Sequence, residues 1–139
     1  MNNNKSFKCV VAVPARLESK RLPNKVLIDI GGKSMLQLVL EQCSKAKSID
    51  KVILCTDSKK IKRSIERIGY KVLLTKKNCE SGTDRIASKT VDIISYLWDT
   101  HLSEKLSFKE KVDRTMIINV QGDQPTINPK LIEETFKKL

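Results

Sequence analysis

The sequence predicts an α/β fold with a mostly parallel β-sheet that is covered by helices on both faces. Short apolar runs alternate with segments of helical periodicity along the 139 residues. This repeated order favours parallel strands, because each helix returns the chain to the edge at which the next strand begins. A second observation is a cluster of cations directly after the first apolar run, at the edge where open α/β sheets bind ligands. Together they predict a ligand-binding α/β domain.

Four strands and four helices are expected in alternation. Apolar runs rich in β-branched residues predict strands at 7–13, 51–55, 71–74 and 115–120. Apolar residues at helical spacing predict helices at 34–46, 58–68, 84–98 and 129–139. The polar stretch 99–113 has neither pattern and predicts a surface loop that contains the single histidine, His101.

The helix at 58–68 shows how these expectations arise. Ile61, Ile65 and Ile68 fall on one face and predict a buried stripe. Asp57 is the expected N-cap, and Gly69 is the expected end of the helix. The opposite face carries five cations, which we interpret as a solvated surface: Lys59, Lys60, Lys62, Arg63 and Arg67.

The composition is strongly basic, with a formal net charge of +11 and a pI near 9.6. This balance leaves nucleic-acid binding open as an alternative function, because cations bind phosphate backbones without sequence preference. The cations are spread along the whole chain, however, and no basic segment interleaved with aromatic residues provides a stacking platform. We therefore favour a small anionic ligand and expect no nucleic-acid partner.

The four cysteines indicate whether a zinc site is expected and in which cellular compartment the protein is expected. Cys9, Cys43, Cys55 and Cys79 are far apart and form no Cys-x-x-Cys pair, which argues against a zinc site. The first three fall in apolar patterns and are expected in the core of a protein kept in a reducing, cytoplasmic compartment. The apolar run 9–13 is too short for a signal peptide or a membrane span, so no membrane association is expected.

The basic loop follows the first strand and carries four cations, Arg16, Lys20, Arg21 and Lys25, against a single carboxylate. Prolines at positions 14 and 23 restrict the backbone, so the cations are expected on a partly ordered loop. Guanidinium and ammonium groups gathered in this way suit a polyphosphate. The alternative is a solvated basic loop without a ligand.

A second informative segment, Ser81-Gly82-Thr83-Asp84-Arg85, lies between the strand at 71–74 and the helix that follows it. Ser81 or Thr83 can cap that helix, and Gly82 permits a close approach of its backbone to neighbouring groups. Free N–H groups at such a turn can hydrogen-bond a base edge or an anion. An ordinary capped turn is the alternative.

A third segment, Gln121-Gly122-Asp123, places one carboxylate at the end of the strand at 115–120. Mg²⁺ that accompanies a nucleotide is commonly bound by one or two carboxylates together with phosphate oxygens and water. Asp123 is therefore a candidate Mg²⁺ ligand beside the basic loop, provided that the two strands are neighbours. A turn in which Asp123 is only a local cap is the alternative.

In this order, the three segments resemble motifs of sugar-acid cytidylyltransferases, most closely the 3-deoxy-manno-octulosonate cytidylyltransferase (CMP-Kdo synthetase) family. They match as Pro-Ala-Arg-Leu-x-Ser-x-Arg-Leu-Pro-x-Lys, Ser-Gly-Thr-Asp-Arg and Val-Gln-Gly-Asp. The resemblance implies a Rossmann-like nucleotidyltransferase sandwich. It also implies a reaction of CTP with 3-deoxy-manno-octulosonate that gives CMP-Kdo and pyrophosphate for lipopolysaccharide biosynthesis.

The resemblance also implies roles for individual residues. Arg16, Arg21 and Lys25 would hold the triphosphate at the start of the site, beside Pro14 and Ala15. Ser81, Gly82 and Thr83 would meet the cytidine, while Arg85 would support the site by an ion pair or reach a phosphate. Gln121 would lie near the nucleotide, and Asp123 would bind Mg²⁺. The implied substrates are CTP and a 3-deoxy-octulosonic acid, and complete family members are expected to be homodimers.

The chain departs from the family pattern at two places. Asn78, Cys79 and Glu80 stand where the family commonly has Asp-His-x, and Gln124 replaces the usual glutamate. The resemblance further implies that residues 1–139 are a nucleotide-binding portion of a domain that is truncated at its carboxyl end. Two alternatives to an active enzyme therefore remain: a CTP-binding fragment that is inactive or half of a split enzyme, and a basic nucleic-acid-binding domain.

Overall fold

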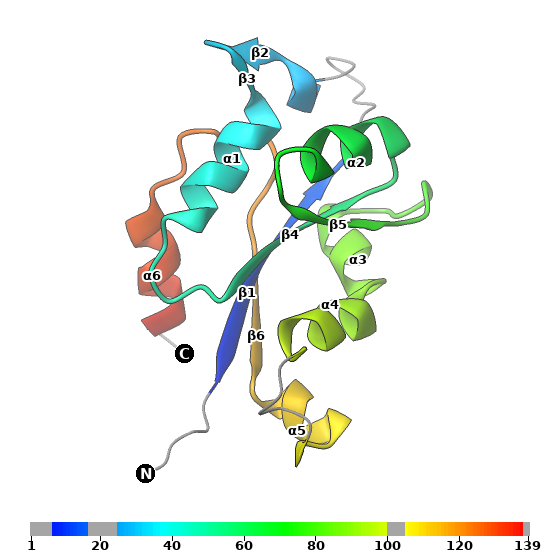
Figure 1. Ribbon diagram of the computed structural model, residues 1–139, viewed down its shortest axis with the longest axis vertical. Helices are drawn as coiled ribbons and strands as arrows, with labels where there is room; N and C mark the ends of the chain where they lie inside the picture. The colour runs from blue at the N-terminus through cyan, green and yellow to red at the C-terminus, as the bar shows by residue number, and fades with distance from the viewer. Residues whose placement is uncertain (1–6, 17–24, 100–104, 138–139) are drawn as a thin grey trace.

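The computed structural model describes residues 7–16, 25–99 and 105–137, and its centre is a four-stranded parallel sheet (Figure 1). The strand order is β5-β4-β1-β6. The strands are β1 (Lys8–Ala15), β4 (Lys51–Thr56), β5 (Lys71–Leu74) and β6 (Thr115–Asn119). Strand β1 pairs with β4 on one side and with β6 on the other, so that Val11 faces both Val52 and Ile118. The predicted α/β class and the parallel sheet are confirmed.

Helices cover both faces of this sheet, as expected (Figure 1). Side chains of β1 alternate between the faces because successive residues of a strand point in opposite directions. Val11 and Val13 pack with α1 (Met35–Ser44), α2 (Lys59–Glu66) and α6 (Pro129–Lys137). Val10 and Ala12 pack with α3 (Gly82–Ala87) and α4 (Thr90–Leu97). Burial on both faces explains why β1 is an unbroken apolar run.

Three cysteines lie in the core, as the apolar patterns predict. Cys9, Cys43 and Cys55 are each fully buried, whereas Cys79 is partly exposed. Burial raises the pKa of the Cys9 and Cys43 thiols to about 12, since a thiolate is poorly solvated there. These three thiols therefore stay protonated and inert at neutral pH.

The prediction of a single helix at 84–98 is wrong, because the chain forms two helices, α3 and α4, with a break at Ser88 and Lys89. At this break the Ser88 hydroxyl donates to the Arg85 carbonyl at 2.7 Å, and the Thr90 hydroxyl donates to the Ala87 carbonyl at 2.9 Å. Hydroxyl groups that bond nearby carbonyls compete with helix continuation.

The end assignments of α2 also need correction. Ser58, not Asp57, is the N-cap, and its hydroxyl accepts from the Ile61 N–H at 3.1 Å. Ile68 lies beyond the last helical residue and is 41% exposed, so it does not extend the buried stripe of Ile61 and Ile65. Gly69 ends this turn as expected, with a φ of 97° that few other residues adopt.

Four short elements were not predicted. A 3-10 turn, η1 (Lys25–Leu27), is followed by a hairpin of β2 (Asp29–Ile30) and β3 (Lys33–Ser34), which turns at two positive-φ glycines. Helix α5 (Phe108–Asp113) occupies part of the stretch expected to be a loop. Its capping box, formed by Ser107 and Glu110, is a sequence signal that could have revealed it. Among the described residues, every helix is too short or too polar to span a bilayer.

Candidate functional site

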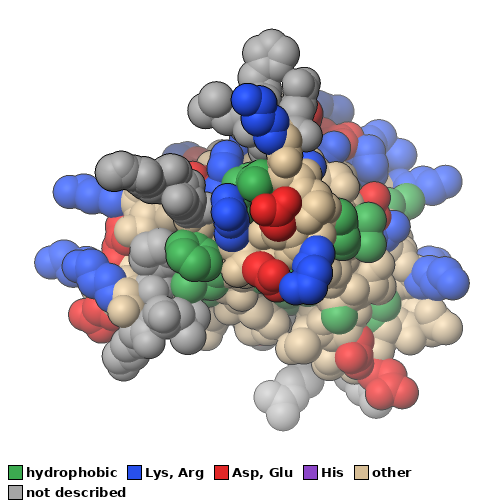
Figure 2. Space-filling model, turned by 90° about the horizontal axis from the view of Figure 1, so that it is seen from below, with side chains coloured by type: hydrophobic (Ala, Val, Ile, Leu, Met, Phe, Trp, Pro, Cys, Tyr) green, Lys and Arg blue, Asp and Glu red, His purple; other side chains and the backbone are tan. Residues whose placement is uncertain are grey.

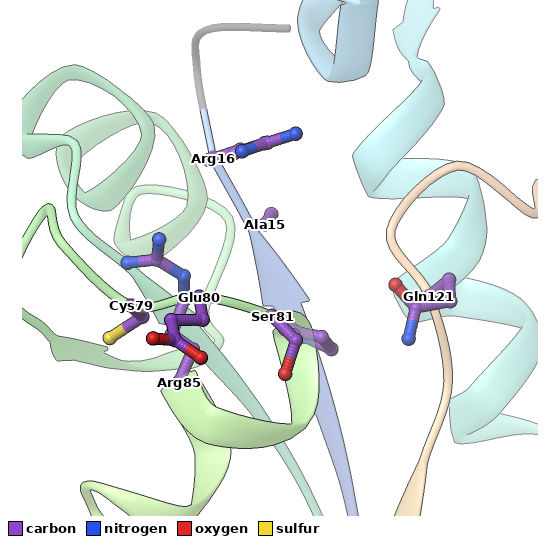
Figure 3. Close-up of a pocket in the computed structure, with 9 residues that line it drawn as sticks. Ala15, Arg16, Cys79, Glu80, Ser81, Arg85 and Gln121 are labelled. Atoms are coloured by element: carbon purple, nitrogen blue, oxygen red, sulfur yellow. The ribbon is translucent and has the colours of Figure 1, made fainter.

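A cavity opens at the carboxyl end of β1, where two of the predicted segments and the start of the third come together (Figure 3). It encloses about 180 Å³ and is lined by Pro14, Ala15, Arg16, Cys79, Glu80, Ser81, Gly82, Arg85 and Gln121. The chain runs from β1 to β4 and β5 on one side of the sheet and then crosses to β6 on the other. Such a reversal of strand order leaves a crevice beyond the strand ends, where open α/β sheets bind ligands.

Arg16 follows the last residue of β1 and extends from the strand end into an exposed position (Figure 3). It makes no hydrogen bond or ion pair with any other residue that the structure describes. Arg21, together with Lys20, lies outside the described residues. Lys25 opens η1, but its side chain is likewise not described. Of the predicted triphosphate ligands, the structure thus places Arg16 alone in the cavity wall.

The turn that begins α3 packs against the end of β1. Ser81 is the N-cap, and its hydroxyl accepts from the Asp84 N–H at 3.1 Å. A Cβ added to Gly82 would lie 2.8 Å from Pro14 Cγ and 3.3 Å from Gln121 Oε1. Real Cβ atoms do not approach a rigid proline ring so closely, so any larger residue at this position would force the turn and Pro14 apart. A close approach at Gly82 is present as predicted, and the neighbouring atoms belong to the side chains of Pro14 and Gln121.

Arg85 is in the cavity wall, yet its side chain is only 4% exposed. Its Nη1 donates to Thr75 Oγ1 at 2.5 Å and to the Lys76 carbonyl at 2.9 Å. Its Nη2 lies 3.9 Å from a carboxylate oxygen of Asp57. The ion pair expected for Arg85 is therefore present, and its partner is Asp57. Burial raises the pKa of nearby Cys55 to about 11, and the positive charge of Arg85 partly opposes that rise.

Gln121 faces the cavity from the side opposite Ser81 (Figure 3). Its Nε2 donates to Asn119 Oδ1 at 3.1 Å, and Asn119 Nδ2 donates to Thr83 Oγ1 at 3.3 Å. Thr83 does not line the cavity but connects the start of α3 to the end of β6. This chain of bonds points Gln121 Oε1 toward the Gly82 turn, so an acceptor oxygen is available near the cavity.

Asp123 lies in the turn after β6 and is exposed. The turn packs closely against the end of β1: a Cβ added to Gly122 would lie only 3.2 Å from the Pro14 carbonyl oxygen. Strands β1 and β6 are neighbours, which was the condition for placing Asp123 beside the basic loop. In the part of the chain that the structure describes, no group of three or more His, Cys, Asp or Glu residues is arranged to hold a metal ion.

Sequence reasoning missed three residues of this site: Asp57, Thr75 and Asn119. Each lies at or directly after the carboxyl end of a strand, namely β4, β5 and β6. A polar residue at that position was the available signal, since these strand ends meet along one edge of a parallel sheet.

This fold and site define an α/β protein with a polar cavity beyond the ends of its parallel strands, and comparison with known proteins narrows the class. A family model described as cytidylyltransferase matches residues 10–139, so the chain belongs to the cytidylyltransferase family. The resemblance inferred from the three motifs is confirmed.

The particular relatives are 3-deoxy-manno-octulosonate cytidylyltransferases. One from Francisella tularensis subsp. novicida is 44% identical over 129 residues, which are 93% of this chain and 45% of the relative. One from Chloroherpeton thalassium is 37% identical over 130 residues, or 94% of this chain and 45% of the relative. The chain thus spans a little less than half the length of the curated relatives that it matches.

Solved structures agree with this assignment. A CMP:2-keto-3-deoxy-manno-octonic acid synthetase described as complexed with CTP superposes with a TM-score of 0.74 at 33% identity, covering 94% of this chain and 46% of that one. A cytidylyltransferase from Leptospira borgpetersenii superposes with a TM-score of 0.68 at 20% identity, covering 96% and 49%, and supports the fold alone.

Proposed function

We propose that this chain supplies the nucleotide-binding part of a 3-deoxy-manno-octulosonate cytidylyltransferase. In the proposed reaction, CTP and 3-deoxy-manno-octulosonate give CMP-Kdo and pyrophosphate, and the product serves lipopolysaccharide biosynthesis. The observation that carries the proposal is the convergence of Arg16, the Ser81–Gly82 turn and Gln121 on one cavity. These residues offer a cation for the phosphates of a nucleoside triphosphate, and backbone donors and a side-chain amide that can hydrogen-bond the rest of the nucleotide.

Each residue of the site would bind the part of the nucleotide that suits its side chain or backbone. Arg16 would bind phosphate oxygens, and Arg21 and Lys25 would join it from the basic loop. Ser81 and Gly82 would meet the cytidine portion through the turn that packs against Pro14. Gln121 would hydrogen-bond the nucleotide from the opposite wall, with its amide orientation set by Asn119 and Thr83.

The proposed transfer needs no protein nucleophile. The anomeric hydroxyl of the sugar acid would attack the α-phosphorus of CTP, forming a new P–O bond as the bond to the pyrophosphate oxygen breaks. The hydroxyl proton would leave to solvent, and pyrophosphate would depart with the bonding electrons. The chain would contribute by holding the reactants in line and by neutralising phosphate charge with its cations.

Mg²⁺ is part of this proposal, and the residues present fit it. Asp123 offers one exposed carboxylate at the edge of the site, and nucleotide-bound Mg²⁺ needs one or two carboxylates besides phosphate oxygens and water. When bound there, the ion would supply charge neutralisation at the reacting phosphate.

The first test is calorimetric titration of the chain with CTP in the presence of Mg²⁺, with UTP and ATP as competitors. We expect CTP to bind most tightly, and equal binding of all three nucleotides would contradict the cytidine assignment. Pyrophosphate release with CTP and Kdo then tests turnover. The matched stretch is 45% of each relative, so we expect nucleotide binding by the 139-residue polypeptide but little transfer.

The nucleic-acid alternative requires a separate test. On the face shown in Figure 2, lysine and arginine side chains are scattered among acidic and apolar ones and do not form a stripe. Binding to a duplex through phosphate contacts would weaken steeply with salt. If the chain binds a DNA duplex with such a salt dependence and CTP does not compete, the alternative gains support over the proposed function.

A further inference from the structure

Arg85 stands out in the cavity wall because almost no part of its charged side chain reaches solvent. It is one of three buried polar or charged residues among those described, with Thr56 and Thr75. A buried cation is stable only when other groups replace the lost water. Here the replacements are the Thr75 hydroxyl, the Lys76 carbonyl and the Asp57 carboxylate.

These three partners come from two different strand ends. Asp57 directly follows β4, whereas Thr75 directly follows β5. The Thr75 N–H donates to the Thr56 carbonyl at 2.8 Å, which extends the β4–β5 pairing by one residue. Thr75 is thereby anchored to the sheet on its backbone side and to α3 on its side-chain side. Arg85 therefore connects helix α3 with the ends of both strands.

The loop 76–81, which connects β5 to α3, forms one wall of the cavity through Cys79, Glu80 and Ser81. Within the described part of the chain, the other side-chain bonds of this loop are local. The Cys79 thiol lies 3.5 Å from the Lys76 carbonyl, and Ser81 caps its own helix. Arg85 is the side chain that ties this loop to the strand ends, through Lys76 and Thr75.

We propose that Asp57, Thr75 and Arg85 form a clamp that sets the position of the cavity wall, with Arg85 as a positioning residue and not a phosphate ligand. The clamp holds loop 76–81 against the sheet, so Gly82, which follows this loop, stays close to Pro14. Its effect on CTP binding rests on the proposed function, whereas its effect on the loop does not.

Charge and burial support a positioning role over direct binding. The guanidinium already has a carboxylate and two oxygen acceptors within the protein, and swinging it toward a phosphate would abandon them. Asp57 would then lose its cation at a position where its side chain is only 15% exposed. Leaving buried polar groups unpaired is costly, so the resting arrangement is favoured.

The test uses Cys79 as a reporter of loop position that needs no nucleotide. Thr75→Val removes the hydroxyl that accepts from Arg85 but keeps the shape of the side chain, whereas Thr75→Ser keeps the hydroxyl. Alkylation of Cys79 is measured by mass spectrometry of the intact chain, together with CTP affinity by calorimetry. We expect Thr75→Val to alkylate about tenfold faster and to bind CTP about tenfold more weakly, the factor for one charge-assisted hydrogen bond. Thr75→Ser should stay close to the unaltered chain.

Thr135→Val is the matched control, because Thr135 is exposed on α6 and its hydroxyl bonds its own helix. Asp57→Asn provides a second test if Thr75→Val fails to fold, with Asp92→Asn on the exposed face of α4 as its control. Equal alkylation rates in the folded Thr75 or Asp57 variant and in the unaltered chain would overturn the clamp. If Cys79 is alkylated faster in the variant, but neither the variant nor the unaltered chain binds CTP, the clamp is upheld and the proposed function is refuted. Tighter CTP binding by Asp57→Asn would show that Arg85 is a phosphate ligand after all.

Discussion

Two arginines stand in the wall of the same cavity, and their environments differ completely. Arg85 is buried at 4% exposure and bonded to three protein groups, whereas Arg16 is exposed and bonded to none of the other described residues. Both carry a full positive charge at neutral pH. The difference teaches that a cation in a binding site is available to a ligand only if the fold has not already paired it.

The surroundings of each arginine explain the contrast. Arg85 projects from α3 beneath a loop, so it loses water and must find partners in the protein. Arg16 follows the last residue of the central strand, where the cavity opens, and water can solvate it until an anion arrives. We therefore expect substitution of Arg85 to affect chiefly stability and substitution of Arg16 to affect chiefly affinity.

The largest effect is expected from Arg85→Met, which keeps an unbranched stem but removes the guanidinium group and its charge. Asp57 and Thr75 would lose their partner inside the protein, so the free energy of unfolding should fall by about 3 kcal/mol. Urea denaturation followed by circular dichroism measures this change. Arg63→Met, at an exposed position on α2, is the control and should change stability by less than about 0.5 kcal/mol. An Arg85→Met variant that is as stable as the unaltered chain would contradict the contrast drawn between Arg85 and Arg16.

Gly82→Ala tests the contact that joins the two sides of the site. The added methyl group would lie 2.8 Å from Pro14 Cγ, and overpacking of this kind costs about 2 kcal/mol. We expect weaker CTP binding and a lower unfolding midpoint, although alanine is otherwise the better helix former.

The control for Gly82→Ala is the double variant Pro14→Ala/Gly82→Ala. Removal of the proline ring takes away the atom that the new methyl group would meet, so affinity should partly recover. If the single variant binds CTP like the unaltered chain, the close packing at this turn is not needed for the site.

Arg16→Met should show the opposite signature to Arg85→Met. Loss of one charge-assisted contact to phosphate should weaken CTP binding about tenfold, or roughly 1.5 kcal/mol. The free energy of unfolding should change by less than about 0.5 kcal/mol, because the side chain is exposed. Calorimetry and urea denaturation on one preparation measure both quantities, with Arg67→Met as the surface control. Unchanged CTP affinity would remove Arg16 from the site.

Asp123→Asn is expected to have the smallest effect, confined to the dependence on Mg²⁺. The carboxamide keeps the size of the side chain but removes the charge that attracts the ion. CTP titrations with Mg²⁺ and with EDTA should differ for the unaltered chain and differ less for the variant. Asp113→Asn on α5 is the control. The same Mg²⁺ dependence in the variant would exclude Asp123 as a ligand.

Local sequence patterns determined most of the secondary structure and the position of the site. All four predicted strands form, and β5 occupies the predicted residues 71–74. Apolar periodicity succeeds here because both faces of β1 are buried, which leaves a continuous run that any window of the sequence detects. The three motifs were also visible, since each follows a strand and combines charge, glycine or a carboxylate in a short stretch.

Predictions from local sequence patterns were wrong where two local structures were open to the same residues. Asp57 and Ser58 are both good N-caps by residue type, and the choice of Ser58 leaves Asp57 beside Arg85. The break between α3 and α4 has a similar origin, since Ser88 and Thr90 can either continue the helix or bond its last carbonyls. No local rule decides between such options.

The sequence by itself determined that this chain is an α/β protein with cations, a Ser-Gly-Thr turn and a Gln-Gly-Asp turn at its strand ends. Only the tertiary structure decided which of these groups face the cavity and which are used by the fold. Thr83 bonds Asn119 at a separation of 36 residues, and Arg85 pairs with Asp57 across two strand ends. The physical reason is the arrangement of the elements: placing β6 beside β1 and α3 over β1 and β4 creates contacts between distant residues that no sequence period encodes.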